Sequence, residues 1–264
     1  MQQEVKFESL RRFNLIMGGV HLVQAILMVF LATTVIQTIG EFTPTITQFY
    51  LAFDAESQSL VIRSRALFEL PFGLFVALFL FISAVAHGVI ALPKRTSEIY
   101  RKDLGKGINK FRWYEYALSS SIMIVLIATL FGVYDIASLI LIFIVNASMN
   151  LFGLMMEQLN SGKTKNTVDW GPFIYGSIAG LAPWIAIFIY MGGIGDLSMV
   201  PWFVWAIVVT YFIAFNTFPV NMILQYARVG KWQSYLYGER VYIVLSLVAK
   251  TLLAWLVLFG AMQP

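Results

Sequence analysis

The sequence predicts an all-α integral membrane protein, a seven-transmembrane-helix bundle with a small β-hairpin in its first extracellular loop. Three observations predict this fold class. Of the 264 residues, 59% are hydrophobic and only 12% are charged, which is about half the charged fraction of an ordinary soluble domain. The mean hydropathy is +0.77. Seven apolar segments each reach the ~20 residues that a helix needs to cross the hydrocarbon core of a bilayer.

The seven predicted spans occupy most of the chain and leave short connections between them. We therefore expect a single membrane domain over residues 1–264, without a separate soluble domain. The chain has no cysteine, which excludes disulfides and thiolate chemistry. The spans are expected at Phe13–Gln37, Ala66–Leu92, Trp113–Val133, Ile136–Glu157, Trp170–Gly193, Met199–Gln225 and Tyr235–Met262.

Lysine and arginine residues predict the orientation of these spans. If the N-terminus is cytoplasmic, most of them fall in cytoplasmic segments and only Arg63 and Arg65 fall outside. The positive-inside rule then places the N-terminus in the cytoplasm and the C-terminus outside the cell, in a multi-pass protein of the plasma membrane. Because the basic residues form no single patch, no nucleic-acid partner is expected. The cytoplasmic set is Lys6, Arg11, Arg12, Lys94, Arg95, Arg101, Lys102, Lys106, Lys110, Arg112, Lys163, Lys165, Arg228, Lys231 and Arg240.

The longest extracellular connection, at about residues 38–65, has the composition of a β-hairpin. Its runs "TITQFYLAF" and "SLVIRS" are rich in β-branched and aromatic residues, and the polar "DAESQ" between them suits a turn. The segment therefore predicts a small extracellular hairpin. An irregular lid over the bundle is the alternative.

One lysine, Lys250, lies deep inside the last predicted span. It is ten residues after Arg240 and fourteen before Pro264, or about 15 Å and 21 Å of helix. The alternative to a functional role is that the side chain snorkels, that is, extends along the helix to bring its ammonium group to an interface. The Lys250 side chain is too short to reach either interface in this way. A desolvated lysine of this kind is typically paired or used covalently, and its amine forms Schiff bases with aldehydes. We therefore expect Lys250 to have a functional role.

A protonated Schiff base needs a counter-ion, and Glu115 is the predicted one. Most other acidic residues, Glu239 among them, are assigned to connections, and Glu69 and Glu157 to span ends. Glu115, in "KFRWYEYALSSS", enters a span beyond the anchoring Arg112. Taken alone, it could equally be an interfacial glutamate. Together with an intramembrane lysine, it is interpreted as the counter-ion.

Both histidines lie on the cytoplasmic side of Lys250 and predict a polar network there. His21 is nine residues past Arg12, and His87 is six residues before Pro93. Any one of these groups could simply make an interhelical hydrogen bond. As a group, they predict a network that can accept a proton. Its expected members are His21, His87, Arg112, Tyr116 and Asn146.

These residues resemble the microbial rhodopsins, and more closely the heliorhodopsins, the branch with inverted membrane orientation. The resemblance covers essentially the whole chain. It rests on the lysine of the seventh span, "RWYE" in the third, "NLIMGGVHLVQ" in the first and "FPVNMILQY" at the end of the sixth. The cytoplasmic N-terminus and the long first extracellular loop are similar too.

The resemblance implies roles for individual residues. Lys250 would hold all-trans retinal as a covalent Schiff base, Glu115 would be the sole counter-ion, and Ser119 would face the chromophore. Ion pumps of this kind usually have a second carboxylate where this chain has Ser246, and a proton donor where it has Leu126. Further pocket residues are expected at Phe215, which replaces a tryptophan usual in the pumps, and at Pro219, Met149 and Trp170.

The sequence therefore favours a retinal-binding photosensor that is not an enzyme, with internal proton transfer and no sustained ion transport. The resemblance also implies a homodimer. The signal is expected to reach an unidentified cytoplasmic partner through the basic cytoplasmic face, and no metal site is expected. Two alternatives stay open. One is a light-driven or light-gated ion transporter, which would need a polar path on both sides of Lys250. The other is a receptor or enzyme that uses Lys250 as a catalyst, which would need further acid or base groups around it.

Overall fold

The computed structural model of the protein describes residues 2–35, 43–193, 195–196, 198 and 200–261. Within these residues, seven helices are long and apolar enough to cross a membrane. A two-stranded antiparallel hairpin accompanies them, so the predicted seven-helix bundle with a small hairpin is confirmed. The seven helices are α1 (Gln2–Phe30), α3 (Phe72–Ala91), α5 (Lys110–Leu130), α6 (Ile136–Leu159), α7 (Gly171–Gly192), α8 (Trp202–Tyr226) and α9 (Tyr235–Ala261).

The start of the second span differs from the prediction. Residues 66–69, predicted as its first turn, belong to strand β2, and α3 begins at Phe72 directly after Pro71. Proline lacks the N–H group that a helix interior needs, and it is tolerated where a helix begins. The predicted ends at Gln37, Met199 and Met262, and residues 38–42 of the loop, lie outside the described residues.

The third span begins three residues earlier than predicted, at Lys110. Asn109 caps this helix, because its side-chain oxygen accepts a hydrogen bond from the Arg112 N–H at 3.0 Å. Asparagine is among the strongest N-cap residues. The helix ends at Leu130, just before Gly132, whose φ of 88° lies in the left-handed region that favours glycine. The early start places Arg112 inside the helical bundle.

A further helix, α4 (Lys94–Gly105), fills the connection between α3 and α5 and was not predicted. It is amphipathic. Tyr100 and Leu104 are buried against the bundle, whereas Lys94, Arg95 and Lys102 are exposed. Such a helix stays at the edge of the bundle because only one of its faces is apolar.

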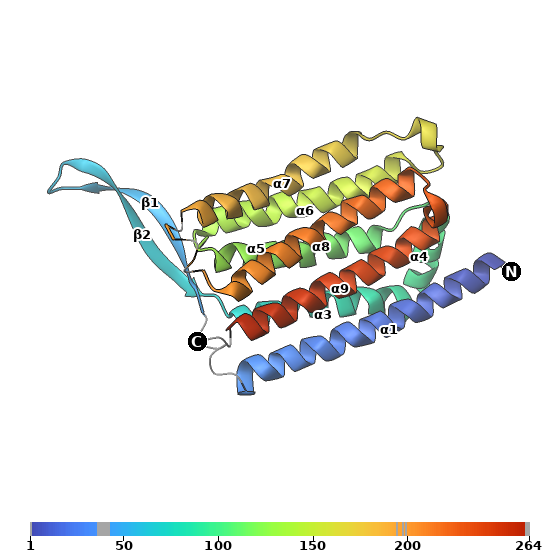
Figure 1. The fold of residues 1–264 in the computed structure, drawn as a ribbon, viewed down its shortest axis with the longest axis horizontal. Helices are drawn as coiled ribbons and strands as arrows, with labels where there is room; N and C mark the ends of the chain where they lie inside the picture. Colours follow the sequence, from blue (N-terminus) through green and yellow to red (C-terminus); the bar gives the residue numbers. More distant parts are fainter. Residues whose placement is uncertain (1, 36–42, 194, 197, 199, 262–264) are drawn as a thin grey trace.

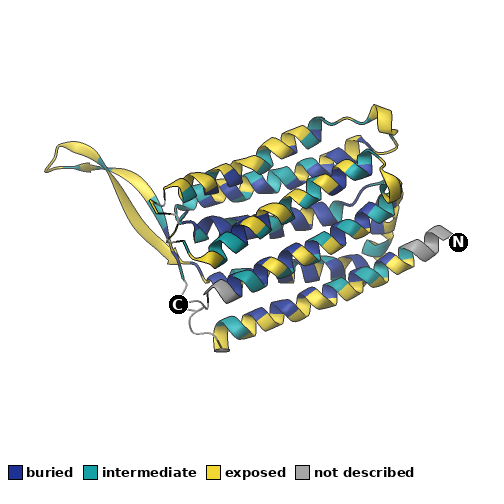
Figure 2. Ribbon diagram, viewed as in Figure 1, coloured by how far each residue is buried: buried dark blue, intermediate teal, exposed yellow. Residues whose placement is uncertain are grey.

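The hairpin consists of β1 (Thr45–Asp54) and β2 (Ser59–Glu69). Its turn is ordered by Asp54, whose carboxylate accepts hydrogen bonds from the N–H groups of Ser57 and Glu56 and thereby has a lowered pKa. The hairpin is tied to the bundle by the Thr47 N–H, which donates to the Tyr134 carbonyl at 2.9 Å. Most of its other residues are exposed, as Figure 2 shows.

The hairpin and α4 mark opposite ends of the bundle (Figure 1). We call these the hairpin end and the α4 end. Around the bundle, α1 packs on α3, α3 on α5, α5 on α6 and α6 on α7, while α8 packs on α9. The outward faces of the helices expose large apolar side chains, in keeping with lipid as their solvent (Figure 2).

Candidate functional site

The site is centred on a buried ion pair between α9 and α5. Lys250 Nζ lies 2.6 Å from Glu115 Oε1, and the two side chains are only 4% and 7% exposed. Ser246, one turn before Lys250, accepts a hydrogen bond from Nζ at 2.9 Å, and Ser83 of α3 donates one to Glu115 Oε1 at 2.7 Å. The ring of Tyr116 lies 5.3 Å from Nζ. A buried charge is tolerated when it is paired and hydrogen-bonded in this way.

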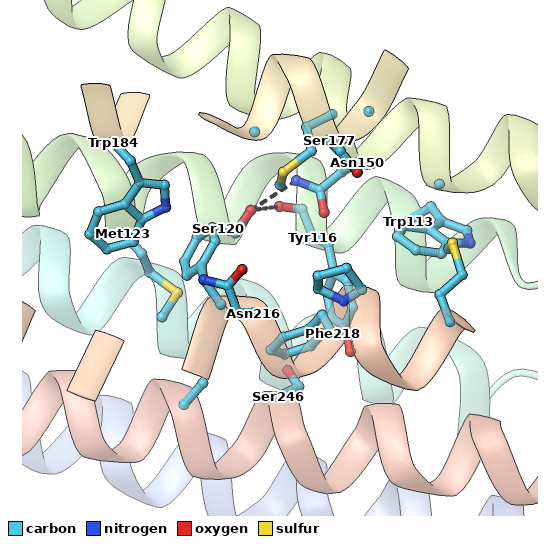
Figure 3. A pocket seen from close by; sticks show the side chains of 18 of the residues that line it. Trp113, Tyr116, Ser120, Met123, Asn150, Ser177, Trp184, Asn216, Phe218 and Ser246 are labelled. Carbon is cyan, nitrogen blue, oxygen red and sulfur yellow. Dashed lines mark hydrogen bonds between the residues drawn. The ribbon is translucent and has the colours of Figure 1, made fainter. Parts of the chain in front are cut away.

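A cavity of about 270 Å³ reaches this lysine from between α5, α6, α7 and α8. It is far larger than the roughly 10–15 Å³ that one water molecule needs. Figure 3 shows Trp113 and Trp184 toward opposite ends of it, with Tyr116 and Phe218 between them. Its walls are mostly aromatic, aliphatic and methionine side chains, so the cavity suits an elongated apolar ligand.

Glycines on α6 and α7 shape this wall. A Cβ atom on Gly153 would overlap the Trp113 ring, and one on Gly180 would lie 2.5 Å from the Met149 sulfur. Larger residues at either position would displace these two side chains, which line the cavity. The glycines therefore set its shape as much as the bulky residues do.

Most of the predicted pocket residues line the cavity. Trp170 does not, because it lies at the N-terminus of α7 and packs against Phe173 and Tyr226, with ring centroids 5.6 Å and 6.2 Å away. Trp184 and Tyr211 also line the cavity and were not predicted. Their helices are apolar on all sides, so the sequence carries no signal for which aromatic residues point inward. The predicted residues that line it are Lys250, Ser119, Ser246, Met149, Phe215 and Pro219.

The two histidines stack on each other at the α4 side of the ion pair. Their ring centroids are 5.7 Å apart with an interplanar angle of 13°. His87 Nδ1 lies 2.8 Å from Asn14 Oδ1, whereas neither ring nitrogen of His21 has a hydrogen-bond partner among the described residues. His87 also lines a small cavity of about 30 Å³ together with Glu115 and Ser246. Its volume and polar lining suit about two water molecules.

The other predicted network residues lie in different places. Tyr116 lines both cavities, and its hydroxyl donates to the Tyr242 carbonyl at 3.0 Å. Asn146 of α6 instead donates to Ser120 and Ser121 of α5, at 2.9 Å and 3.0 Å. The structure therefore brings His87, Arg112 and Tyr116 together around the small cavity and leaves Asn146 outside it.

Arg112 differs most from its predicted surroundings. It was assigned to a cytoplasmic connection, but its side chain is 4% exposed and forms ion pairs with both Glu157 and Glu239, each 1% exposed. Glu157 was assigned to a span end and lies in the last turn of α6, whereas Glu239 was assigned to a connection and lies within α9, so the structure corrects the assignment of Glu239. A signal was present in the sequence, because both lie within the predicted limits of apolar spans. The partner of each became visible only when α5, α6 and α9 were placed together.

The family model for Heliorhodopsin matches residues 10–262 of the chain. The chain belongs to the heliorhodopsin family. A comparison with curated proteins finds no match. Membership of the family indicates a retinal-binding photoreceptor of the rhodopsin type and a multi-pass membrane protein. The residues present fit such a chromophore, because a buried amine with its carboxylate opens onto a large and mostly apolar cavity.

Proposed function

We propose that the protein is a light sensor in which Lys250 binds retinal covalently and Glu115 is the counter-ion. The observation that carries this proposal is the buried contact of 2.6 Å between Lys250 Nζ and Glu115 at the edge of the large cavity. Among the lysines whose burial the structure describes, which leaves out Lys6, no other is buried. The amine is therefore the one that an apolar aldehyde in this cavity would meet.

Retinal held as a Schiff base on Lys250, all-trans in the resting state, would supply absorption of visible light and a light-driven change in the proton affinity of the nitrogen. The protein supplies the setting. Glu115 stabilises a positive charge on the nitrogen, and Ser83 and Ser246 fix the carboxylate and the amine through their hydrogen bonds. Within a low-dielectric site, this fixed carboxylate is worth more than it would be in water.

The proton is proposed to move toward the α4 end. His87, Arg112 and Tyr116 line the small polar cavity together with Glu115, and His21 stacks on His87. Asn146 would take part only indirectly, through Ser120. On the other side of Lys250, the described residues of the bundle core bury no charged side chain. A transported ion would need polar groups or ordered water on that side, so nothing here favours a transporter.

The α4 end is proposed to be cytoplasmic and to pass on the signal. Support comes from the exposed basic residues of α4 and from the basic connections at the same end, which fit the positive-inside rule. An unidentified cytoplasmic partner is proposed to read this basic surface, and a homodimer is proposed from the resemblance alone. The function proposed is sensory and not enzymatic.

The test of the proposal is colour. Purified Lys250→Ala protein should show no visible absorption after retinal is added, because the attachment point is lost. Lys106→Ala is the matched control, because Lys106 is exposed at the α4 end, and it should bind retinal with the unmodified spectrum. Circular dichroism and gel filtration check that both variants fold. Visible absorption in folded Lys250→Ala protein would overturn the assignment of Lys250.

A further inference from the structure

We propose that the buried cluster of Arg112, Glu157 and Glu239 is a store for one proton and that it takes up the proton released at Lys250 in the light. We call these three residues the arginine cluster. The uptake of a proton by the cluster is a property of the protein alone. Its use in the light reaction rests on the function proposed above.

The arginine cluster joins α5, α6 and α9 on the α4 side of the ion pair. Arg112 donates to Glu157 through one terminal nitrogen and to Glu239 through the other. Asn109, the cap of α5, donates its side-chain N–H to Glu239 at 2.6 Å and its backbone N–H to Glu157 at 2.8 Å. Tyr235 donates to Glu157 at 3.0 Å. All of these donors point at carboxylate oxygens.

In this proposal both carboxylates are ionised at rest, because every group of the donor set can donate to a carboxylate oxygen. The N–H groups of Arg112 and Asn109 can only donate, so an oxygen that faces them cannot carry a proton toward them. One guanidinium then faces two carboxylates, which leaves a net charge of −1 in a buried site. An uncompensated buried charge is costly, and two neighbouring carboxylates favour the protonation of one of them. Binding one proton would make the cluster neutral.

A proton bound to the cluster also needs a neighbouring group that can accept a hydrogen bond from it. Tyr100 of α4 donates its hydroxyl proton to Glu239 at 3.2 Å, and its pKa is raised by burial and by the nearby Glu239, so it stays a neutral hydroxyl. A hydroxyl can reverse its direction and accept from a protonated Glu239, which the nitrogen donors cannot do. Glu157 also faces a hydroxyl, that of Tyr235 at 3.0 Å, but of the two glutamates it is Glu239 that lines the small cavity. We therefore assign Glu239 as the member of the pair that is protonated.

Two connections link the arginine cluster to the site of proton release. The small cavity is lined by Glu115 and also by Arg112 and Glu239, so water in it would bridge the ion pair and the arginine cluster. A series of side-chain contacts forms the second connection. His87 contacts Asn14 at 2.8 Å, and Asn14 donates to the Tyr100 hydroxyl at 3.4 Å, which in turn meets Glu239.

The proton and charge balance of the step is simple. The N–H bond at Lys250 breaks, and an O–H bond forms at Glu239. Before the step, the Lys250 and Glu115 pair is neutral and the cluster carries −1. Afterwards, Glu115 carries the unpaired negative charge and the cluster is neutral. The total charge of the site is unchanged, so the step needs no ion from outside and produces no net transport.

The arginine cluster also contacts α4, through Tyr100. Protonation of Glu239 changes the hydrogen bond that holds Tyr100, and Tyr100 is one of the side chains that anchor α4 to the bundle. The exposed basic face of the same helix would then respond to the proton. In this way the photoreaction would change the contact of α4 with the bundle.

The first experiment uses the protein without retinal and infrared spectroscopy. On mild acidification, we expect one buried carboxyl group to gain a proton and to show the C=O stretching band of a protonated carboxylic acid. Glu239→Gln and Glu157→Gln should each remove this band, because either change leaves a neutral pair with Arg112. That neutral pair also favours folding of both variants. Glu98→Gln is the control, because Glu98 is an exposed acid of α4 outside the cluster, and it should keep the band.

The second experiment uses the retinal-bound protein and light-induced infrared difference spectra. The carboxylic acid band should appear when the Schiff base loses its proton, and Glu239→Gln should abolish it. If Glu239→Gln does not fold, Tyr100→Phe should shift the frequency of the band, because it removes the hydroxyl that faces Glu239. A band unaffected by these changes would overturn the proton store and leave the light sensor standing. Failure of the unmodified protein to form a coloured pigment would overturn the sensor itself.

Discussion

The two halves of the bundle, on either side of Lys250, bury different kinds of side chains. Toward the hairpin end, the core is built from Leu126, Ile127 and Leu253, which are each at most 1% exposed. Toward the α4 end, the core contains Arg112 and Glu239, which are almost as well buried. Both halves exclude solvent to a similar degree. They differ in whether the buried groups can hold a charge.

This difference determines in which direction a proton released at Lys250 can move. The α4 half offers carboxylates, histidines and a small polar cavity that Glu115 of the ion pair also lines. The hairpin half offers packed hydrocarbon, in which an unpaired charge costs several kcal/mol. A proton released at Lys250 therefore has acceptors on one side and a barrier on the other.

In the α4 half, Arg112→Gln should be the most damaging change. It leaves two buried carboxylates without their cation, and breaking a buried ion pair costs about 3–5 kcal/mol. We expect the free energy of unfolding of the retinal-free protein in detergent to fall by about this amount. Denaturant titration measures it.

The control for Arg112→Gln is Arg95→Gln. Arg95 is exposed on α4, so its loss should change stability by no more than about 0.5 kcal/mol. Acidification should restore part of the stability of Arg112→Gln, because protonated glutamates no longer repel each other. If the loss is small, or the same at neutral and acidic pH, the arginine cluster is not held together by charge.

In the hairpin half, Leu126→Ala should cost somewhat less, about 2–5 kcal/mol, through the cavity that it leaves. Leu126 is fully buried. Because its surroundings carry no charge, the loss should be the same at neutral and acidic pH. The same denaturant titration measures it. A strongly pH-dependent loss would mean that the two halves are less different than the structure indicates.

The smallest expected effect is the absence of sustained transport. In vesicles that contain the retinal-bound protein, illumination should give no stationary photocurrent and no steady pH change sensitive to a protonophore. His87→Phe should alter the rate or amplitude of Schiff-base deprotonation while transport stays at zero. A stationary current with the action spectrum of the pigment would show that the hairpin half conducts ions, and it would restore the transporter alternative.

Much of the fold could be predicted because the signals are local. Seven long apolar runs specify seven helices, and "DAESQ" between two β-branched runs specifies the hairpin turn. The boundaries were less accurate where a single residue decides them. Two helices begin at other residues than predicted, α3 after Pro71 and α5 after Asn109. Residues 66–69, predicted in the second span, belong to β2. Helix α4 was missed because its polar sequence resembles a connection.

The sequence by itself determined the depth of Lys250 and the number of spans. Both follow from counting residues against the fixed thickness of a bilayer. The tertiary structure decided which side chains meet. Arg112 and Glu239 are 127 residues apart, and Arg112 and Glu157 are 45 apart. Helices in lipid are apolar on nearly every side, so no periodic pattern marks the face that points inward. Only the packing of α5 against α6 and α9 turns separate charges at span ends into one buried cluster.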